Sequence, residues 1–473
     1  MSASLPLPCP DLTTAPAATP CPNKTQTLVA TIIASSLAFV LGSIINVALP
    51  QMRADFDVGP AGAQWIVNAY LLPLGAFVLM GGALGDHYGR KKVFQVGLLV
   101  FAASCLLCAI AWSFPVLLAA RALEGVAAAM IAPTSLAIIA DTFPEEERGQ
   151  AVGTWAGIGA AAGAVAPVIG GLIVDSVGWR WAFVAVVPIA LLGWAIARRA
   201  VRESRAPRQD CAPLDWTGAA LISAGLLALI WGLIAAPVQG LTPPVTLALF
   251  AAALLLGAYI VAEARLGDRA MTPLPLFRNV RFSGLTVFTL LLYGALGGFM
   301  LLLPYVLIED LGYGASAAGA AILPFPLILG LLSRFAGGAL VARFGTRLLL
   351  SVGAGLVGLG FLLFAQIPST DVSYARHILP GLLALAFGMA LSVAPLTAAV
   401  LASAGPNLAG VASGINNAVS RIGGLVATAL LGVVLVGSAD DLLAGFARAA
   451  WAGVALALAA ATTAAITVRN GTA

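Results

Sequence analysis

Charged residues are scarce in this sequence. Only 9% of the 473 residues are Asp, Glu, Lys or Arg, whereas 60% are hydrophobic. A soluble protein carries roughly 25% charged residues, so this chain lacks an ordinary water-facing surface. Apolar runs of about 20 residues, long enough to cross a bilayer, recur from one end of the chain to the other. These features exclude a soluble globular protein and indicate a protein embedded in the lipid bilayer.

Motifs for several common functions are also absent. No Gly-x-x-x-x-Gly-Lys-Ser/Thr segment occurs. This excludes a nucleotide-binding loop of that type, and with it transport driven by ATP bound to such a loop. The basic residues form no patch interleaved with aromatic residues, so we expect no binding to nucleic acid. The five cysteines and two histidines form no cluster with metal-ligand spacing, so we expect no metal site and no cofactor. A membrane-embedded enzyme would need a nucleophile, a base or a metal, and no such constellation is found.

The long apolar runs predict an all-α polytopic membrane protein with 14 spans, whose ends are placed to within a few residues. Residues 1–26, rich in Pro, Thr, Ala and Ser, predict a disordered cytoplasmic tail. No basic segment of a signal peptide precedes the first run, which we therefore interpret as a retained span. The predicted spans cover residues 27–49, 63–84, 93–113, 115–140, 150–173, 180–197, 215–235, 243–263, 282–306, 316–341, 348–367, 376–402, 411–437 and 448–468.

A short basic loop separates the second and third predicted spans. The chain turns back tightly here, which Gly89 permits. Asp86 lies four residues before Arg90, a spacing at which the two side chains can pair. Short basic loops remain on the cytoplasmic side, so the loop is predicted there. We assign a gating role to five of its residues: Gly82, Asp86, Gly89, Arg90 and Lys91.

The same pattern returns at residues 338–347, again with Gly-Ala-Leu, an aromatic residue and a turn glycine. This internal repeat predicts two related halves. The first copy follows the second predicted span and the second copy follows the tenth, so two extra spans lie between two six-helix halves. We therefore divide the chain into a first half at 27–197, a middle part with two basic loops and two extra spans at 198–281, and a second half at 282–473.

The basic residues are distributed unequally between the two sides of the predicted bundle. Of the 24 Lys and Arg residues, seventeen lie in segments on the side of the 89–92 turn and four lie on the opposite side. The remaining three, Arg121, Arg334 and Arg421, lie inside predicted spans. Since positive loops stay inside, we predict that both termini are cytoplasmic and that the protein lies in the cell (inner) membrane.

These segments resemble the major facilitator superfamily, in its fourteen-span branch of drug:proton antiporters. Residues 82–92 match that superfamily's loop signature, including the Asp and the basic cluster. Residues 121–125 are similar to its Arg-x-x-Gln-Gly pattern, with Glu124 where Gln is usual. Residues 162–171 resemble the antiporter signature Gly-x-x-x-Gly-Pro-x-x-Gly-Gly, with alanines at the first two glycine positions. The resemblance links antiport to four packing residues of this segment: Ala166, Pro167, Gly170 and Gly171.

The sequence also departs from this branch at two places. Exporters of organic cations in the branch often carry an acid in the first span, and the segment Leu41-Gly42-Ser43-Ile44-Ile45 has none. In the second copy of the loop signature, Ala342 stands in the place of Asp86, so only the first half has the complete loop.

Glu124 is the one acid that lies deep inside a predicted span, about 14 Å along the fourth helix at 1.5 Å per residue. Burial in lipid favours the protonated form of a carboxyl, whereas Arg121, three residues earlier on the same face, favours the ionised form. We hypothesise that Glu124 and Arg121 couple transport to protons. The alternative is a permanent ion pair that joins this helix to its neighbours.

A second group of residues is a candidate lining for a central substrate cavity. Arg421 is the deepest charge of the second half, and Asn417 lies one turn before it. The alternatives are helix packing for this pair, and anchoring at the membrane interface for the aromatic members. The candidates are Asn46, Trp65, Tyr70, Asn417 and Arg421.

The resemblance implies a proton-coupled secondary transporter, a monomer, that exports small amphipathic or drug-like compounds from the cytoplasm by alternating access. A proton-coupled uptake or exchange carrier for a small metabolite is the alternative function on the same fold. In both cases the partners are a small-molecule substrate, protons and the lipid bilayer.

The charge distribution yields a first test. A reporter that is active only in the cytoplasm should be active when fused after Ala473, because the positive loops orient the chain with this end inside. Labelling of that end by an impermeant reagent added to intact cells would contradict the prediction.

Overall fold

The computed structural model describes residues 23–205, 215–267, 270, 272–336, 339–368, 371–404, 408–436 and 442–468. Every regular element in these residues is a helix. A chain inside lipid must satisfy its backbone N–H and C=O groups internally, and a helix does so within one segment. The predicted all-α polytopic membrane protein is therefore confirmed. Residues 1–22 of the predicted tail lie outside the described part.

Six long helices form the first part of the chain, and each overlaps one predicted span. They are α1 (Lys24–Asp55), α2 (Pro60–Tyr88), α3 (Arg90–Ala109), α4 (Phe114–Thr142), α5 (Glu145–Val177) and α6 (Trp179–Ala200).

The two predicted extra spans correspond to α7 (Trp216–Gln239) and α8 (Pro243–Leu266). The last part of the chain contains longer and shorter helices, with the helical turns η2 (Leu274–Arg278) and η3 (Tyr374–Ile378) between some of them. Its helices are α9 (Val280–Glu309), α10 (Ala315–Ile322), α11 (Pro324–Ala336), α12 (Ala339–Ala365), α13 (Leu379–Ala404), α14 (Ala409–Val436) and α15 (Leu442–Thr467).

Two helices differ from the predicted spans. The span predicted at 316–341 consists of α10 and α11, which are separated at Leu323, just before Pro324 and Pro326. Proline has no N–H to donate, so the helical hydrogen-bond ladder is interrupted there. Conversely, α12 begins before its predicted span because it continues through a bend at Gly345.

The bend at Gly345 corresponds to the turn at Gly89. Gly89 has a φ of 110° and separates α2 from α3, and Gly345 has a φ of 75° within the second copy of the pattern. Both values lie in the region that glycine adopts without steric cost. The repeat seen in the sequence thus has the same backbone feature at equivalent places in the two copies.

Thirteen segments of the described residues are long and apolar enough to cross a membrane. Thirteen of the fourteen predicted spans correspond to one long helix each, and the span predicted at 316–341 corresponds to α10 and α11 together. Among these helices, α14 lies outside the set of thirteen segments. The count of 14 spans is compatible with the structure and stays a prediction.

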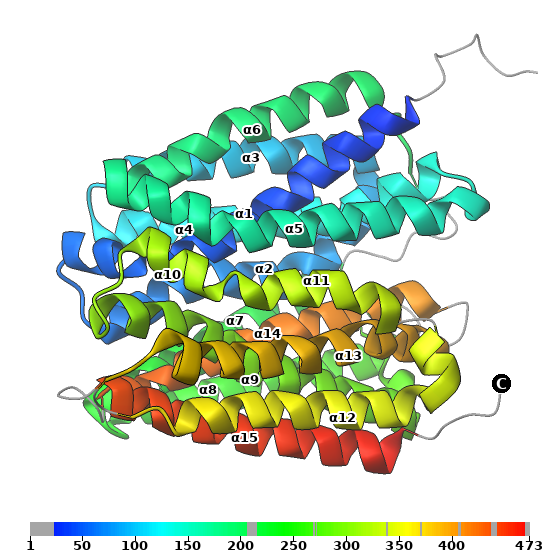
Figure 1. Ribbon diagram of the computed structural model, residues 1–473. Coiled ribbons are helices and arrows are strands. Elements are labelled where there is room, and N and C mark those ends of the chain that lie inside the picture. The colour runs from blue at the N-terminus through cyan, green and yellow to red at the C-terminus, as the bar shows by residue number, and fades with distance from the viewer. Residues whose placement is uncertain are drawn as a thin grey trace, which may run out of the picture.

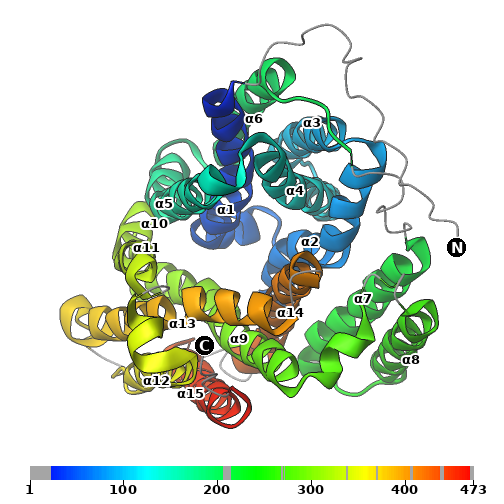
Figure 2. The same ribbon diagram turned by 90° about the vertical axis from the view of Figure 1, so that its right-hand side faces the viewer.

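The helices form two bundles that lie side by side (Figure 1). Helices α1–α6 make one bundle and α9–α15 make the other, with α2 packed on α14 and α5 packed on α10 across the contact. Helix α7 packs on α8 and also on α2 and α14, so the extra pair lies at one edge and touches both bundles (Figure 2).

The contact between α5 and α10–α11 is close at one end of the molecule and leaves open space beside three glycines toward the other. A Cβ added at Gly171 would overlap the backbone of Ala315 and Ser316, and one at Gly319 would overlap that of Pro167. Nearer the end that holds the Gly89 turn, a Cβ at Gly153 would meet nothing within 4 Å. The same holds for Gly157 and Gly330. The bundles are thus in close contact at the end opposite the Gly89 turn, which we call the closed end.

Two polar contacts join the bundles at the closed end. The carboxylate of Asp175, near the end of α5, accepts hydrogen bonds from the backbone N–H groups of Ala315 and Ser316 at 3.0 and 2.8 Å. These N–H groups begin α10 and have no partner inside that helix, so the carboxylate caps it from the other bundle. The guanidinium of Arg53 lies 5.5 Å from the centre of the Tyr305 ring.

We predict that Gly171→Val loosens the closed end, because the added side chain would overlap the α10 backbone. Gly153→Val is the matched control, since it adds the same side chain where there is open space. The measurement is the rate at which a polar maleimide labels Ser316→Cys in detergent, with Cys9, Cys21 and Cys211 replaced by Ser. Gly171→Val should increase that rate severalfold. Equal rates in the two valine variants would show that the close approach does not hold the end closed.

Candidate functional site

A buried ion pair lies within one turn of α4. Arg121 Nη1 and Glu124 Oε2 are 2.8 Å apart, and their side chains are 1% and 0% exposed. The predicted i, i+3 neighbours therefore meet, and they meet away from solvent. A charged pair in so apolar a setting is stable only when its remaining polar atoms also find partners.

Helix α2 supplies two of those partners to Arg121. Its Nε donates to the carbonyl of Ile66 at 3.2 Å, and its guanidinium lies 4.7 Å from the centre of the Tyr70 ring. The helices approach closely because Gly125 faces α2, where a Cβ would overlap the carbonyl of Tyr70. Arg121 thus joins α4 to α2, as the structural alternative proposed from the sequence requires.

Only one of the two carboxylate oxygens of Glu124 takes part in these contacts. Its Oε2 is 3.9 Å from the thiol of Cys108 on α3, but its Oε1 has no hydrogen-bond partner among the described residues. A buried carboxylate oxygen that accepts no hydrogen bond is a site at which a proton can bind. The sequence did not single out Cys108 as a contact of Glu124, because the packing of α3 on α4 is not visible in it.

Tyr70 lies between charges from both bundles. Its hydroxyl donates to the carbonyl of Ala38 on α1 at 3.4 Å. Arg421 of α14 is half-buried beside Gly75 of α2 and lies within electrostatic range of Tyr70 and of Tyr293 on α9. Tyr70 and Arg421, both cavity candidates, therefore influence each other electrostatically across the contact of the two bundles.

The other three cavity candidates lie elsewhere. Trp65 packs in a cluster formed mainly by α7 and α14. Asn46 is half-buried, and its side chain makes no hydrogen bond to another described residue. Asn417 is exposed, whereas its neighbour Asn416 accepts a hydrogen bond from Thr289 of α9 at 2.6 Å. The structure does not gather all five residues into one pocket.

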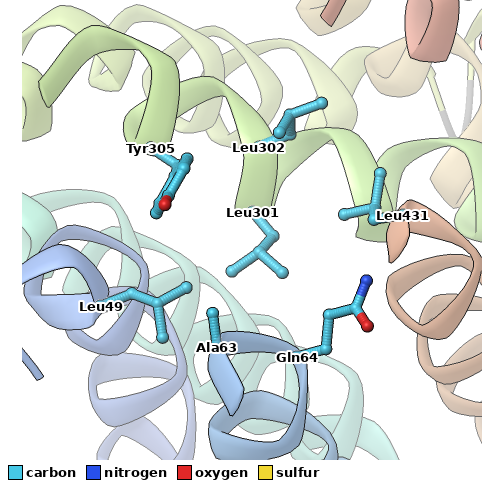
Figure 3. Close-up of a pocket in the computed structure, with 7 residues that line it drawn as sticks. All are labelled: Leu49, Ala63, Gln64, Leu301, Leu302, Tyr305 and Leu431. Atoms are coloured by element: carbon cyan, nitrogen blue, oxygen red, sulfur yellow. The ribbon is translucent and has the colours of Figure 1, made fainter. Parts of the chain in front are cut away.

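Two buried amides on α2 were not singled out from the sequence. Gln64 is 1% exposed and Asn68 is 0% exposed, and neither side chain has a hydrogen-bond partner among the described residues. Their spacing of four residues inside an apolar run is the sequence signal that marks one helix face. Gln64 also lines a small cavity between the bundles, together with Leu49, Ala63, Leu301, Leu302, Tyr305 and Leu431 (Figure 3).

The gating loop forms a network inside the first bundle. Arg90 donates from Nε and Nη2 to Oδ1 of Asp86 at 2.9 and 2.8 Å, and from Nη1 to Asp141 at the end of α4. The hydroxyl of Ser204, after α6, donates to the other oxygen of Asp141. The predicted pairing of Asp86 with Arg90 is present, and it extends to α4 and to the segment after α6.

The segment after α6 also caps α3. The carboxylate of Glu203 accepts from the backbone N–H groups of Lys91 and Lys92 at 3.1 and 3.2 Å. The Lys91 ammonium donates to the carbonyl of Arg198 at 2.8 Å. A Cβ at Gly89 would displace the Glu203 carboxylate, but it is the φ of 110° that requires glycine there. Gly82 packs beside Pro133 of α4.

The stripe of small residues on α5 packs in two directions. Ala166 is buried in a cluster with Ile44 of α1 and Ala182 of α6, and a Cβ at Gly170 would overlap Ile44. Pro167 and Gly171 instead face α10, at the closed end described above. The stripe therefore holds α5 to its own bundle and to the opposite one.

Another buried acid lies near the end of α8. Glu263 is 1% exposed, and its Oε2 accepts from the backbone N–H of Thr272 at 2.6 Å. The Tyr259 hydroxyl is 2.7 Å from the hydroxyl of Thr272. The sequence placed Glu263 at the end of a span, and its burial follows from the packing of α8 on α7 and on the segment that leads to α9. Within the described ranges, no group of three or more His, Cys, Asp or Glu residues is arranged to hold a metal ion.

Two bundles related by an internal repeat, with an ion pair buried inside the first bundle, indicate a membrane transporter. The chain belongs to the major facilitator superfamily, whose family model matches residues 31–428. The predicted major facilitator fold is thereby confirmed, and the protein is a transporter and not an enzyme.

Three relatives are similar over most of the chain. The puromycin resistance protein pur8 of Streptomyces alboniger is 32% identical, covering 90% of this chain and 84% of its own. The multidrug resistance protein Stp of Mycobacterium tuberculosis is 33% identical, with coverages of 87% and 76%. The tetracenomycin C resistance and export protein of Streptomyces glaucescens is 29% identical, with coverages of 88% and 76%.

Solved structures share the fold at low sequence identity. A D-xylose–proton symporter superposes with a TM-score of 0.67 at 15% identity, covering 94% of this chain and 98% of its own. An auto-inhibited peptide transporter of the POT family gives 0.69 at 18% identity, with coverages of 94% and 95%. At these identities the likeness concerns the fold alone.

The gating loop gives a prediction about Asp86. We expect Asp86→Asn to lower the transport rate far more than the equilibrium affinity for substrate. The carboxylate contacts Arg90 at the loop and lies away from the Arg121–Glu124 pair, so its loss should affect the exchange of conformations. The measurement is turnover in vesicles beside the binding constant of the same compound. A large loss of affinity with normal turnover would contradict a gating role.

Proposed function

We propose that this transporter exports small amphipathic or drug-like compounds from the cytoplasm and is driven by proton entry. The observation that carries the proposal is the buried Arg121–Glu124 pair, in which Glu124 Oε1 has no partner in the described part of the chain. Relatives named for resistance to puromycin, for multidrug resistance and for tetracenomycin C export support drug-like compounds as the cargo.

The ion pair explains how a proton would be coupled to movement. When Glu124 is ionised, its charge compensates Arg121 and the pair is neutral as a whole. Protonation of Glu124 would leave the guanidinium uncompensated in a buried site, which is strongly unfavourable. The protonated state is therefore favoured only in a conformation that gives Arg121 water or another partner. Proton binding and rearrangement of the α2–α4 contact thus become linked.

The contact between the bundles supports alternating access. It is close at the end opposite the Gly89 turn, and toward the Gly89 end three glycines of α5 and α11 (Gly153, Gly157 and Gly330) face open space. With the orientation that the loop charges favour, the open end faces the cytoplasm, as an exporter requires when it collects its cargo. The contacts of Gly171 and Asp175 with α10 would then separate when the compound leaves.

This proposal includes the location of the protein and the assignment of its residues. We place it in the cell (inner) membrane with both termini in the cytoplasm, acting as a monomer. The gating loop and the small-residue stripe control the exchange of conformations, and Tyr70 and Arg421 belong to the substrate path. A proton-coupled uptake carrier would use the same parts with the flux reversed.

We predict that Glu124→Gln abolishes proton-driven export while leaving substrate binding intact and insensitive to pH. Glutamine keeps the shape and one acceptor oxygen for Arg121 but cannot take up a proton. The measurement is proton release from acid-loaded inverted vesicles on addition of ethidium, tetraphenylphosphonium or puromycin, together with binding at several pH values. Gln95→Leu on α3, which changes a half-buried amide outside these contacts, is the control.

Uphill export by Glu124→Gln under a proton gradient would assign proton coupling to another group. Compound movement in the opposite direction, together with protons, would identify the wild-type protein as an uptake carrier.

A further inference from the structure

Two uncharged amides are buried without partners on one face of α2. Gln64 and Asn68 are one helical turn apart, and both polar atoms of each side chain lack a hydrogen bond in the described residues. Buried amides are normally paired, because leaving them unpaired forfeits the hydrogen bonds that they make with water. Two of them in adjacent turns suggest that their partner is a molecule other than the protein.

Gln64 faces a cavity at the contact of the two bundles. Leu49 and Ala63 border it from the first bundle, and Leu301, Tyr305 and Leu431 belong to its wall from the second. In Figure 3 the Gln64 carboxamide extends from α2 toward Leu431 of α14. Gln64 and Tyr305 carry polar side-chain atoms, but the surface that the closed cavity exposes is apolar.

The cavity lies where the exported compound would leave. Gln64 is near the start of α2, so it is at the closed end, and the residues that line the cavity come from α1, α2, α9 and α14. When the bundles separate at this end, the faces that now enclose the cavity become the walls of the opening. Gln64 and Asn68 would then both face the path.

The present cavity is too small for such a compound. Its volume available to water is about 20 Å³, enough for about one water molecule. Because the exposed surface of the closed cavity is apolar, the Gln64 amide can gain a hydrogen-bond partner only when the bundles separate at this end.

We propose that Gln64, with Asn68 one turn deeper, determines which compounds pass the closed end, by hydrogen bonding to an uncharged polar group on the substrate. This inference rests on the proposed export function. A carboxamide offers two donors and one acceptor oxygen and carries no charge. The favoured compounds are therefore those that carry an amide or hydroxyl group beside an apolar body, and Leu49, Leu301 and Leu431 accommodate that body.

Hydrogen bonding gives sharper selectivity than the leucines alone. A site that contacts a substrate only through apolar groups discriminates weakly between compounds of similar bulk, whereas a site built to hydrogen-bond a polar group rejects the analogue that lacks it. The role of Gln64 differs from that of Glu124, because it needs no change of protonation.

The test compares two cations of equal charge and similar bulk. N-dodecylnicotinamide carries a primary carboxamide on its ring, and N-dodecyl-3-methylpyridinium carries a methyl group at the same position. Export of each is measured in inverted vesicles for the wild type, Gln64→Leu, Asn68→Leu and the control Gln95→Leu. The readout is the ratio of kcat/KM for the two compounds, which is independent of the amount of folded protein.

We expect the wild type and Gln95→Leu to prefer the carboxamide compound. Gln64→Leu should reduce this preference about tenfold, which is the change in the ratio expected when one neutral hydrogen bond is lost. Asn68→Leu should reduce it in the same direction. Leucine suits the aliphatic lining, so export of the methyl compound should persist and report on folding.

A ratio for Gln64→Leu within twofold of the wild type would overturn the inference and leave the proposed export function intact. Failure of the wild type to export either compound would contradict the proposed function for amphipathic cations, and the inference would fall with it.

Discussion

The Arg121–Glu124 ion pair is the interaction on which the rest of the molecule depends. A charged side chain inside lipid must find a partner within the protein, because no water is available to solvate it. Here the partner is one turn away on α4, while Nε of Arg121 donates to the Ile66 carbonyl and its guanidinium lies over the Tyr70 ring of α2. This arrangement fixes how α2 and α4 pack, and α2 in turn provides much of the surface on which the two bundles meet.

Polar contacts of this kind divide the molecule into parts with different roles. The network of Arg90, Asp86 and Asp141 joins segments of one bundle at the Gly89 end. The Asp175 carboxylate instead joins α5 to the first N–H groups of α10 in the other bundle. Contacts within a bundle can persist while the bundles move, whereas contacts between bundles must break. A polar contact within one bundle therefore stabilises that bundle, whereas a contact between the bundles stabilises one arrangement of the two.

Much of the fold could be predicted because membrane burial leaves a direct trace in the sequence. Apolar runs of bilayer length located the helices, and the repeated turn glycine, found in the structure as Gly89 and Gly345, identified two related halves. The pairing of Asp86 with Arg90 also followed from spacing alone. The break between α10 and α11 at Leu323 was missed, since prolines inside other helices here, such as Pro167 in α5, do not divide them.

The sequence by itself determined the fold class, the tight turns and the side-chain pairs formed within one helical turn, because these depend on residues close together in the chain. Only the tertiary structure decided which helix faces meet. It placed the Cys108 thiol near Glu124, put Trp65 beside α7, and left the amides of Gln64 and Asn68 buried without partners in the described residues. A polar residue in an apolar run looks the same in the sequence whether it faces a partner, a cavity or lipid. The difference arises from helices that are distant in the chain, and local spacing carries no information about them.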